Sequence, residues 1–97
     1  MQTEDNGQVV RIIEHTAHRF GVDKEAIVQG KNSMVNDARL TAMHIAKYHS
    51  GLPQASIANY FGVSASAISI ALKRQAKTLT NPEVKSAIDD LSRIFRR

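Results

Sequence analysis

Side chains that could bind a charged partner gather in the second half of the sequence. Three serines lie at positions 64, 66 and 69, and three cations follow at positions 73, 74 and 77. Serine hydroxyls exchange hydrogen bonds, and lysine and arginine supply positive charge to phosphate oxygens. The stretch 54–82 contains no histidine, aspartate or glutamate that could activate a serine as a nucleophile. These residue types therefore indicate binding to a polyanion, not catalysis.

The distribution of charge supports the same interpretation. The 97-residue chain has a net charge of +4 and a sequence pI of about 9.8. Residues 1–37 contain four basic and six acidic residues, whereas residues 38–82 contain five basic residues and no acid. A polyanion that approaches this acid-free stretch meets no repelling carboxylate from it. The alternative is an ordinary solvated surface.

Two short helices joined by a tight turn are expected to position these side chains. Pro53 suits a first helical turn, Gly62 can adopt the left-handed conformation that ends a helix, and Ser64 is a favourable N-cap. Apolar residues recur at helical spacing on both sides of the turn: Ile57, Ala58, Phe61, Ile68, Ala71 and Leu72. The pattern predicts a helix-turn-helix with its second helix over about 64–79, the unit that reads the DNA major groove. A plain pair of core helices is the alternative.

The rest of the chain also has helical periodicity. We expect a disordered tail over residues 1–7, helices over about 8–20 and 36–49, one helical turn within 22–28, and a last helix from Pro82. The predicted core faces are Val9, Val10, Ile12, Ile13, Ala17 and Phe20; Ala38, Ala42, Met43, Ile45, Ala46 and His49; and Val84, Ala87, Ile88, Leu91, Ile94 and Phe95. No segment alternates with period two for long enough to form a strand. The sequence therefore predicts an all-α bundle of five to six helices, with one domain over residues 8–97.

Several classes of protein lack support. Without cysteine, the chain can form neither a disulfide nor a thiolate zinc site. The histidine pairs at 15/18 and 44/49 lack a third metal ligand at the usual spacing, and no Gly-rich phosphate loop is present. No apolar run approaches the ~20 residues of a membrane helix, and the N-terminus does not resemble a signal peptide. We expect a cytoplasmic protein without enzymatic activity, cofactor, metal, small-molecule substrate or membrane partner.

Two runs of the sequence resemble a known family. Residues 37–47 begin with Asp37-Ala38-Arg39, and residues 52–62 begin with Leu52-Pro53 and end with Phe61-Gly62. Together they look like the C-terminal DNA-binding domain of the bacterial replication initiator DnaA, which has a Trp-repressor-like fold. The resemblance covers roughly residues 8–95. It implies an all-α domain that binds double-stranded DNA.

The resemblance also implies contact residues. In the family a basic loop before the third helix reaches the minor groove, where this chain has Lys31, and the arginine that opens the third helix contacts DNA, where this chain has Arg39. At the turn and the start of the second helix the family carries Gly-Gly-Arg-Asp-His-Thr-Thr. Here Ser64 stands for the aspartate, Ala65 for the histidine, and Ser66 and Ala67 for the threonines.

We therefore expect a double-stranded DNA-binding protein whose second helix enters the major groove. The predicted contact residues are Lys31, Arg39, Ser64, Ala65, Ser66, Ser69, Lys73, Arg74 and Lys77. The alternative is a protein-interaction or dimerisation module that keeps the fold without binding DNA, with Ile70 as its apolar anchor. RNA binding has less support, because nothing resembles an aromatic stacking platform.

Overall fold

A computed structural model of the chain describes residues 2–30, 36–78 and 82–95, and it describes side chains within 8–30, 37–74 and 82–95. All the regular structure in these residues is helical, which confirms the predicted all-α class. The helices are α1 (Gln2–Phe20), α2 (Lys24–Gln29), α3 (Asn36–His49), α4 (Gln54–Phe61), α5 (Ala65–Thr78) and α6 (Pro82–Phe95).

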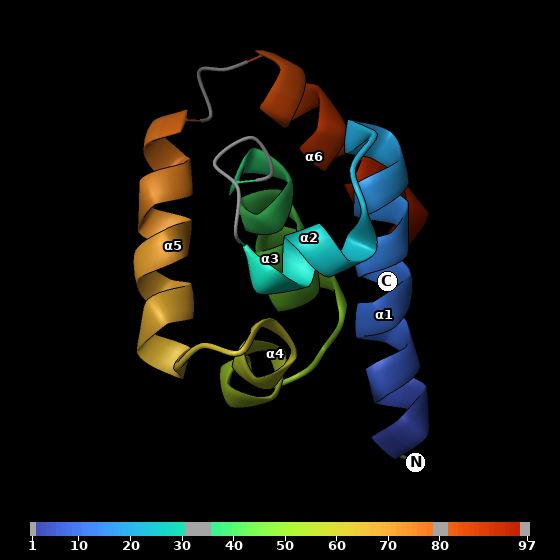
Figure 1. The fold of residues 1–97 in the computed structure, drawn as a ribbon, viewed down its shortest axis with the longest axis vertical. Coiled ribbons are helices and arrows are strands. Elements are labelled where there is room, and N and C mark those ends of the chain that lie inside the picture. The colour runs from blue at the N-terminus through green and yellow to red at the C-terminus, as the bar shows by residue number, and fades with distance from the viewer. Residues whose placement is uncertain (1, 31–35, 79–81, 96–97) are drawn as a thin grey trace.

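Helix α3 lies at the centre, and the other five helices surround it (Figure 1). Helices α1 and α6 pack against each other and against one side of α3, whereas α2, α4 and α5 contact its remaining surface. The protein measures 36 × 26 × 23 Å along its principal axes. Since α3 contacts every other helix, it connects the two halves of the molecule.

The central position of α3 explains why it is buried beyond its predicted face. The predicted residues Ala38, Ala42 and Ala46 are buried, and their small side chains allow neighbouring helices to approach closely. Leu40 and Thr41 are buried as well, although the sequence pattern did not place them in the core. Neighbouring helices cover more of α3 than its apolar stripe, although Lys47 and Tyr48 near its end stay exposed, so periodicity underestimates its burial.

Three details differ from the sequence-based expectations. Helix α1 begins at Gln2, although the helix was predicted from about residue 8, and the disordered tail over residues 1–7 stays a prediction. The segment 2–7 contains no proline, and its single glycine costs a helix only about 1 kcal/mol. Val10 and Ile94 are 42% and 53% exposed, because each lies beside the buried stripe of its helix, where no neighbour covers it.

No single helix among the described residues is long and apolar enough to cross a membrane. Helix α4 together with Ala65–Arg74 passes that test only by length and composition, and the two segments are bent by 86°.

Candidate nucleic-acid interface

Helices α4 and α5 are joined by three residues and bent by 86°. Gly62 adopts a left-handed conformation, with φ of 64°, at the end of α4. The amide of Gly62 donates to the carbonyl of Asn59 at 3.3 Å, and the amide of Val63 donates to that of Ala58 at 3.0 Å. These bonds satisfy carbonyls that the helix leaves unpaired. The turn is therefore closed by the backbone itself, as the sequence predicted for Gly62.

Ser64 begins α5 as its N-cap. Its Oγ accepts a hydrogen bond from the amide of Ala67 at 3.1 Å, which confirms the predicted capping role. Ile68, one turn further, is fully buried and anchors the inner face of the helix. The first turn of α5 is therefore fixed by a cap on its outer side and by a core residue on its inner side.

The outer face of α5 presents Ser66, Ser69, Ile70 and Lys73, all of which are exposed. Arg74 is exposed beside them. We call these five residues the α5 surface. Neither cation has an ion-pair partner among the described side chains, whereas Arg19 and Lys24 elsewhere pair with Asp90 and Glu14.

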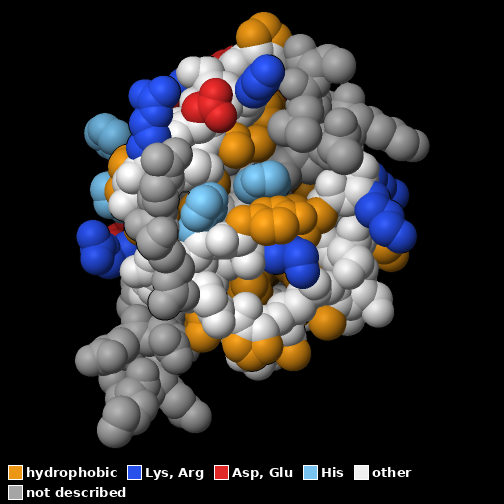
Figure 2. All heavy atoms as spheres, turned by 180° about the vertical axis from the view of Figure 1, so that it is seen from behind, with side chains coloured by type: hydrophobic (Ala, Val, Ile, Leu, Met, Phe, Trp, Pro, Cys, Tyr) orange, Lys and Arg blue, Asp and Glu red, His pale blue; other side chains and the backbone are white. Residues whose placement is uncertain are grey.

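Helices α4 and α5 themselves carry no acidic residue. The side of the molecule drawn in Figure 2 shows cations in its upper and middle parts, and a clearly visible acidic side chain near its top. Unpaired cations on helices without carboxylates leave the α5 surface able to attract an anion.

Gln54, the first residue of α4, was not among the predicted contacts. Its Nε2 donates to the carbonyl of Ala65 at 2.5 Å and to Oγ of Ser69 at 2.7 Å. Its Oε1 accepts a hydrogen bond from Nζ of Lys47 at 2.8 Å. These bonds join the ends of three helices at the start of α5. The partners of Gln54 in α5 lie 11 and 15 residues away in the sequence, so helical periodicity could not reveal them.

Arg39 was expected to contact phosphate, but in the structure its guanidinium is directed into the protein. Nη1 donates to the carbonyls of Ile27, at 2.9 Å, and Val28, and Nη2 donates to that of Phe61 at 3.0 Å. The guanidinium also lies 5.5 Å from the centre of the Phe61 ring. Burial lowers the pKa of Arg39 from its usual range. These bonds make Arg39 a cap for the last carbonyls of α2 and α4, and it is not an open phosphate contact.

The other predicted residues divide into two groups. Ala65 is half-buried, and its carbonyl accepts the hydrogen bond from Gln54. Lys31 lies outside the described residues, and Lys77 belongs to α5 but its side chain is not described. Both lysines therefore stay predictions.

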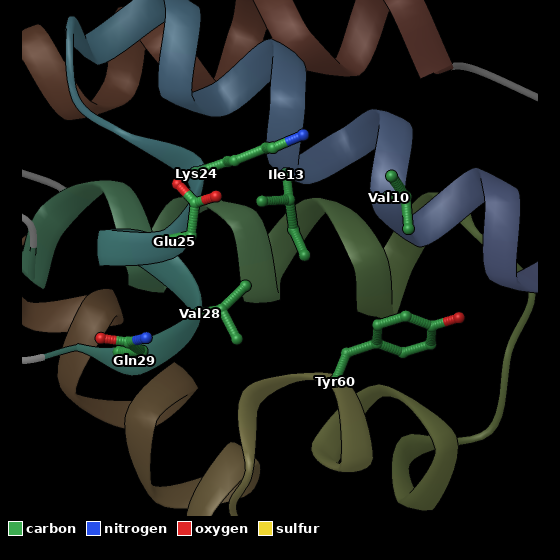
Figure 3. Close-up of a pocket in the computed structure, with 7 residues that line it drawn as sticks. All are labelled: Val10, Ile13, Lys24, Glu25, Val28, Gln29 and Tyr60. Atoms are coloured by element: carbon green, nitrogen blue, oxygen red, sulfur yellow. The ribbon is translucent and has the colours of Figure 1, made fainter.

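Two concave regions accompany these helices. A cleft of about 210 Å³ runs between α3 and α5, and Ile70 and Arg74 lie on its wall together with Arg39, Met43 and Val63. A second hollow of about 290 Å³ lies between α1, α2 and α4 and is mostly apolar (Figure 3). Its residues are Val10, Ile13, Lys24, Glu25, Val28, Gln29 and Tyr60. Neither lining contains the histidine, carboxylate and nucleophile combination of a hydrolytic site.

The described residues contain no group of three or more histidines and acids that could hold a metal ion. No family model matches the chain, and it matches no curated protein and no solved structure.

Proposed function

We propose that this protein binds double-stranded DNA without enzymatic activity and places α5 in the major groove. The observation that carries the proposal is the α5 surface itself, which is exposed, cationic and free of acids, on a helix held at 86° to α4 by a capped turn. This angle and a three-residue turn containing glycine are typical of a helix-turn-helix. The resemblance to the DNA-binding domain of DnaA supports the same function.

The residues would divide the work of binding. Ser66 and Ser69 are near the N-terminal end of α5, the part of a recognition helix that meets base edges. Lys73 and Arg74 lie one turn further and would neutralise phosphates. Lys47, which Gln54 holds beside the start of α5, is an additional cation near this surface. Ser64 and Arg39 would contribute indirectly, because their hydrogen bonds fix α5 and α4.

Fluorescence anisotropy with a labelled random duplex tests the proposal. We expect salt-sensitive binding, with affinity falling along a log–log slope of about −0.9 per neutralised phosphate. The double variant Lys73→Ala/Arg74→Ala should bind about tenfold more weakly on this duplex and should flatten that slope by nearly two units.

Lys85→Ala/Arg93→Ala is the matched control, because it removes two exposed cations from α6. It should bind like the unmodified protein. An equal loss of affinity in the two variants would mean that binding depends only on net charge, and it would contradict a specific role for α5. Absence of binding at ~50 mM salt and micromolar protein would reject DNA binding altogether.

A second function has one observation in its favour. Ile70 is 54% exposed and stands at the edge of the cleft between α3 and α5, where it could anchor a protein partner or a second copy. Light scattering separates the two proposals. A dimer that dissociates in Ile70→Ala and ignores DNA would favour the interaction module, whereas a monomer that binds DNA favours the first proposal.

A further inference from the structure

The hydrogen bonds of Gln54 determine which way its amide group points. The carbonyl of Ala65 can only accept, and the ammonium of Lys47 can only donate. The amide must therefore direct Nε2 toward α5 and Oε1 toward Lys47, as the structure has it. The reversed orientation would place two oxygens against each other at 2.5 Å and two donors against each other at 2.8 Å.

This orientation determines the hydrogen bonding of Ser69. Since Nε2 of Gln54 donates to Oγ of Ser69, the serine oxygen is an acceptor within the protein. No hydrogen bond donated by the Ser69 hydroxyl is found among the described residues, and the side chain is exposed. Toward an outside partner Ser69 therefore acts first as a hydrogen-bond donor. In the major groove the acceptors are O4 of thymine, O6 and N7 of guanine and N7 of adenine, whereas N4 of cytosine is a donor.

Ile70 adds an apolar contact on the same helix. It is 54% exposed, and Ser66, four residues earlier, lies on the same side of α5. Among the four bases, only thymine presents a methyl group in the major groove, and its O4 acceptor is adjacent to that methyl. A surface that combines a fixed donor with an exposed branched apolar side chain is complementary to this pair of groups.

We propose that the α5 surface recognises thymine in the major groove, with Ile70 packed on the C5-methyl group and Ser69 donating to O4, and with Gln54 as the positioning residue for Ser69. The proposal rests on the DNA binding proposed above and names the base that is read. Small side chains at the start of α5 bring the helix close enough for both contacts, because Ala65 and Ser66 leave room for the base edges.

Two 20-base-pair duplexes test this proposal, one of alternating A and T and one in which uracil replaces every thymine. The two differ only by the major-groove methyl, and both keep the O4 acceptor and the same minor-groove pattern. Anisotropy should show that the protein binds the thymine duplex about fourfold more tightly, which corresponds to burying one methyl group. Ile70→Ala should abolish this preference. Ile94→Ala should keep it, because Ile94 is equally exposed, at 53%, but lies on α6.

Ser69 is tested on the same two duplexes. Ser69→Ala should weaken binding to both by about fivefold and leave their ratio unchanged, because uracil retains O4. Gln54→Ala should act in the same direction. Equal affinity for the two duplexes, or a preference that survives Ile70→Ala, would overturn thymine recognition while DNA binding stands. Failure to bind either duplex would reject the proposed function itself.

Discussion

The two halves of the molecule are attached to α3 by different physical means. Helices α1 and α6 bury apolar residues along their length, among them Val9, Ile12, Val84 and Leu91. Helices α2 and α4 also contribute Ile27 and Phe61, but the end of each is held in addition by hydrogen bonds from Arg39. One half is joined by apolar faces, and the other needs a charged side chain inside.

Helix length explains this difference. Every α-helix leaves its last four carbonyls without an intrahelical partner, whatever its length. In α1, with 19 residues, these carbonyls are a small fraction, whereas in α2, with six, and α4, with eight, they are half or more. An arginine carries five donors and can satisfy several carbonyls at once. The short helices α2 and α4 therefore depend on polar contacts that long helices do not require.

The most damaging change should be Arg39→Ala. It removes three charge-assisted hydrogen bonds and leaves carbonyls of α2 and α4 unsatisfied, so we expect a loss of about 3 kcal/mol in the free energy of unfolding. Urea denaturation, monitored by circular dichroism, measures this loss of stability. Arg39→Lys should recover only part of the loss, because an ammonium cannot span both helix ends.

Gly30→Ala provides an independent disruption of the same contact. A Cβ atom at Gly30 would lie 2.7 Å from Nη1 of Arg39, and the residue has φ of +62°. The variant should therefore also be destabilised. If Arg39→Ala unfolds like the unmodified protein but binds DNA more weakly, Arg39 is a phosphate contact and its hydrogen bonds to the ends of α2 and α4 contribute little to stability.

The local parts of the structure could be predicted from the sequence. Asn36 and His49 bound α3 as predicted, and Gly62 and Ser64 form the turn and cap that their residue types favour. These features depend on neighbours within a few residues, which a single sequence contains.

The long-range polar contacts could not be predicted. Arg39 donates to carbonyls that lie 11, 12 and 22 residues away in the sequence. In a basic segment, the sequence pattern is the same for an arginine that faces solvent and for one that points into the protein. The expectation of a phosphate contact came from the family resemblance, which gives a position in the sequence but not the direction of a side chain. Gln54 was missed because its partners Ala65 and Ser69 lie 11 and 15 residues away in the sequence.

Substitution at one of two buried threonines should have a smaller effect, and it should stabilise the protein. Thr16 donates its hydroxyl to the carbonyl of Ile12 at 2.7 Å, whereas Oγ1 of Thr41 has no hydrogen-bond partner in the described part of the chain. Burying an unpaired hydroxyl costs about 1–3 kcal/mol. Thr41→Val should therefore raise the free energy of unfolding by about 1 kcal/mol, measured by thermal and urea denaturation.

Thr16→Val is the control, because it exchanges the same groups at an equally buried position. It should not stabilise the protein, since a made hydrogen bond is lost. If both variants shift stability equally, the hydroxyl of Thr41 is paired in solution, and α3 has no unsatisfied group in its centre.

The smallest effect is expected at the ion pair between α1 and α6. Nε of Arg19 lies 3.2 Å from Oδ2 of Asp90. Because the two side chains are 33% and 49% exposed, water and salt screen the attraction between them. A double-mutant cycle with Arg19→Ala and Asp90→Ala should give a coupling energy below about 1 kcal/mol, and less in 1 M salt. The cycle also removes the bond from Arg19 to Ser86 in both Arg19 variants, so that bond cancels. A coupling energy as large as the loss expected for Arg39→Ala, about 3 kcal/mol, would mean that the α1–α6 half also depends on charge. The contrast between the two halves would then not hold.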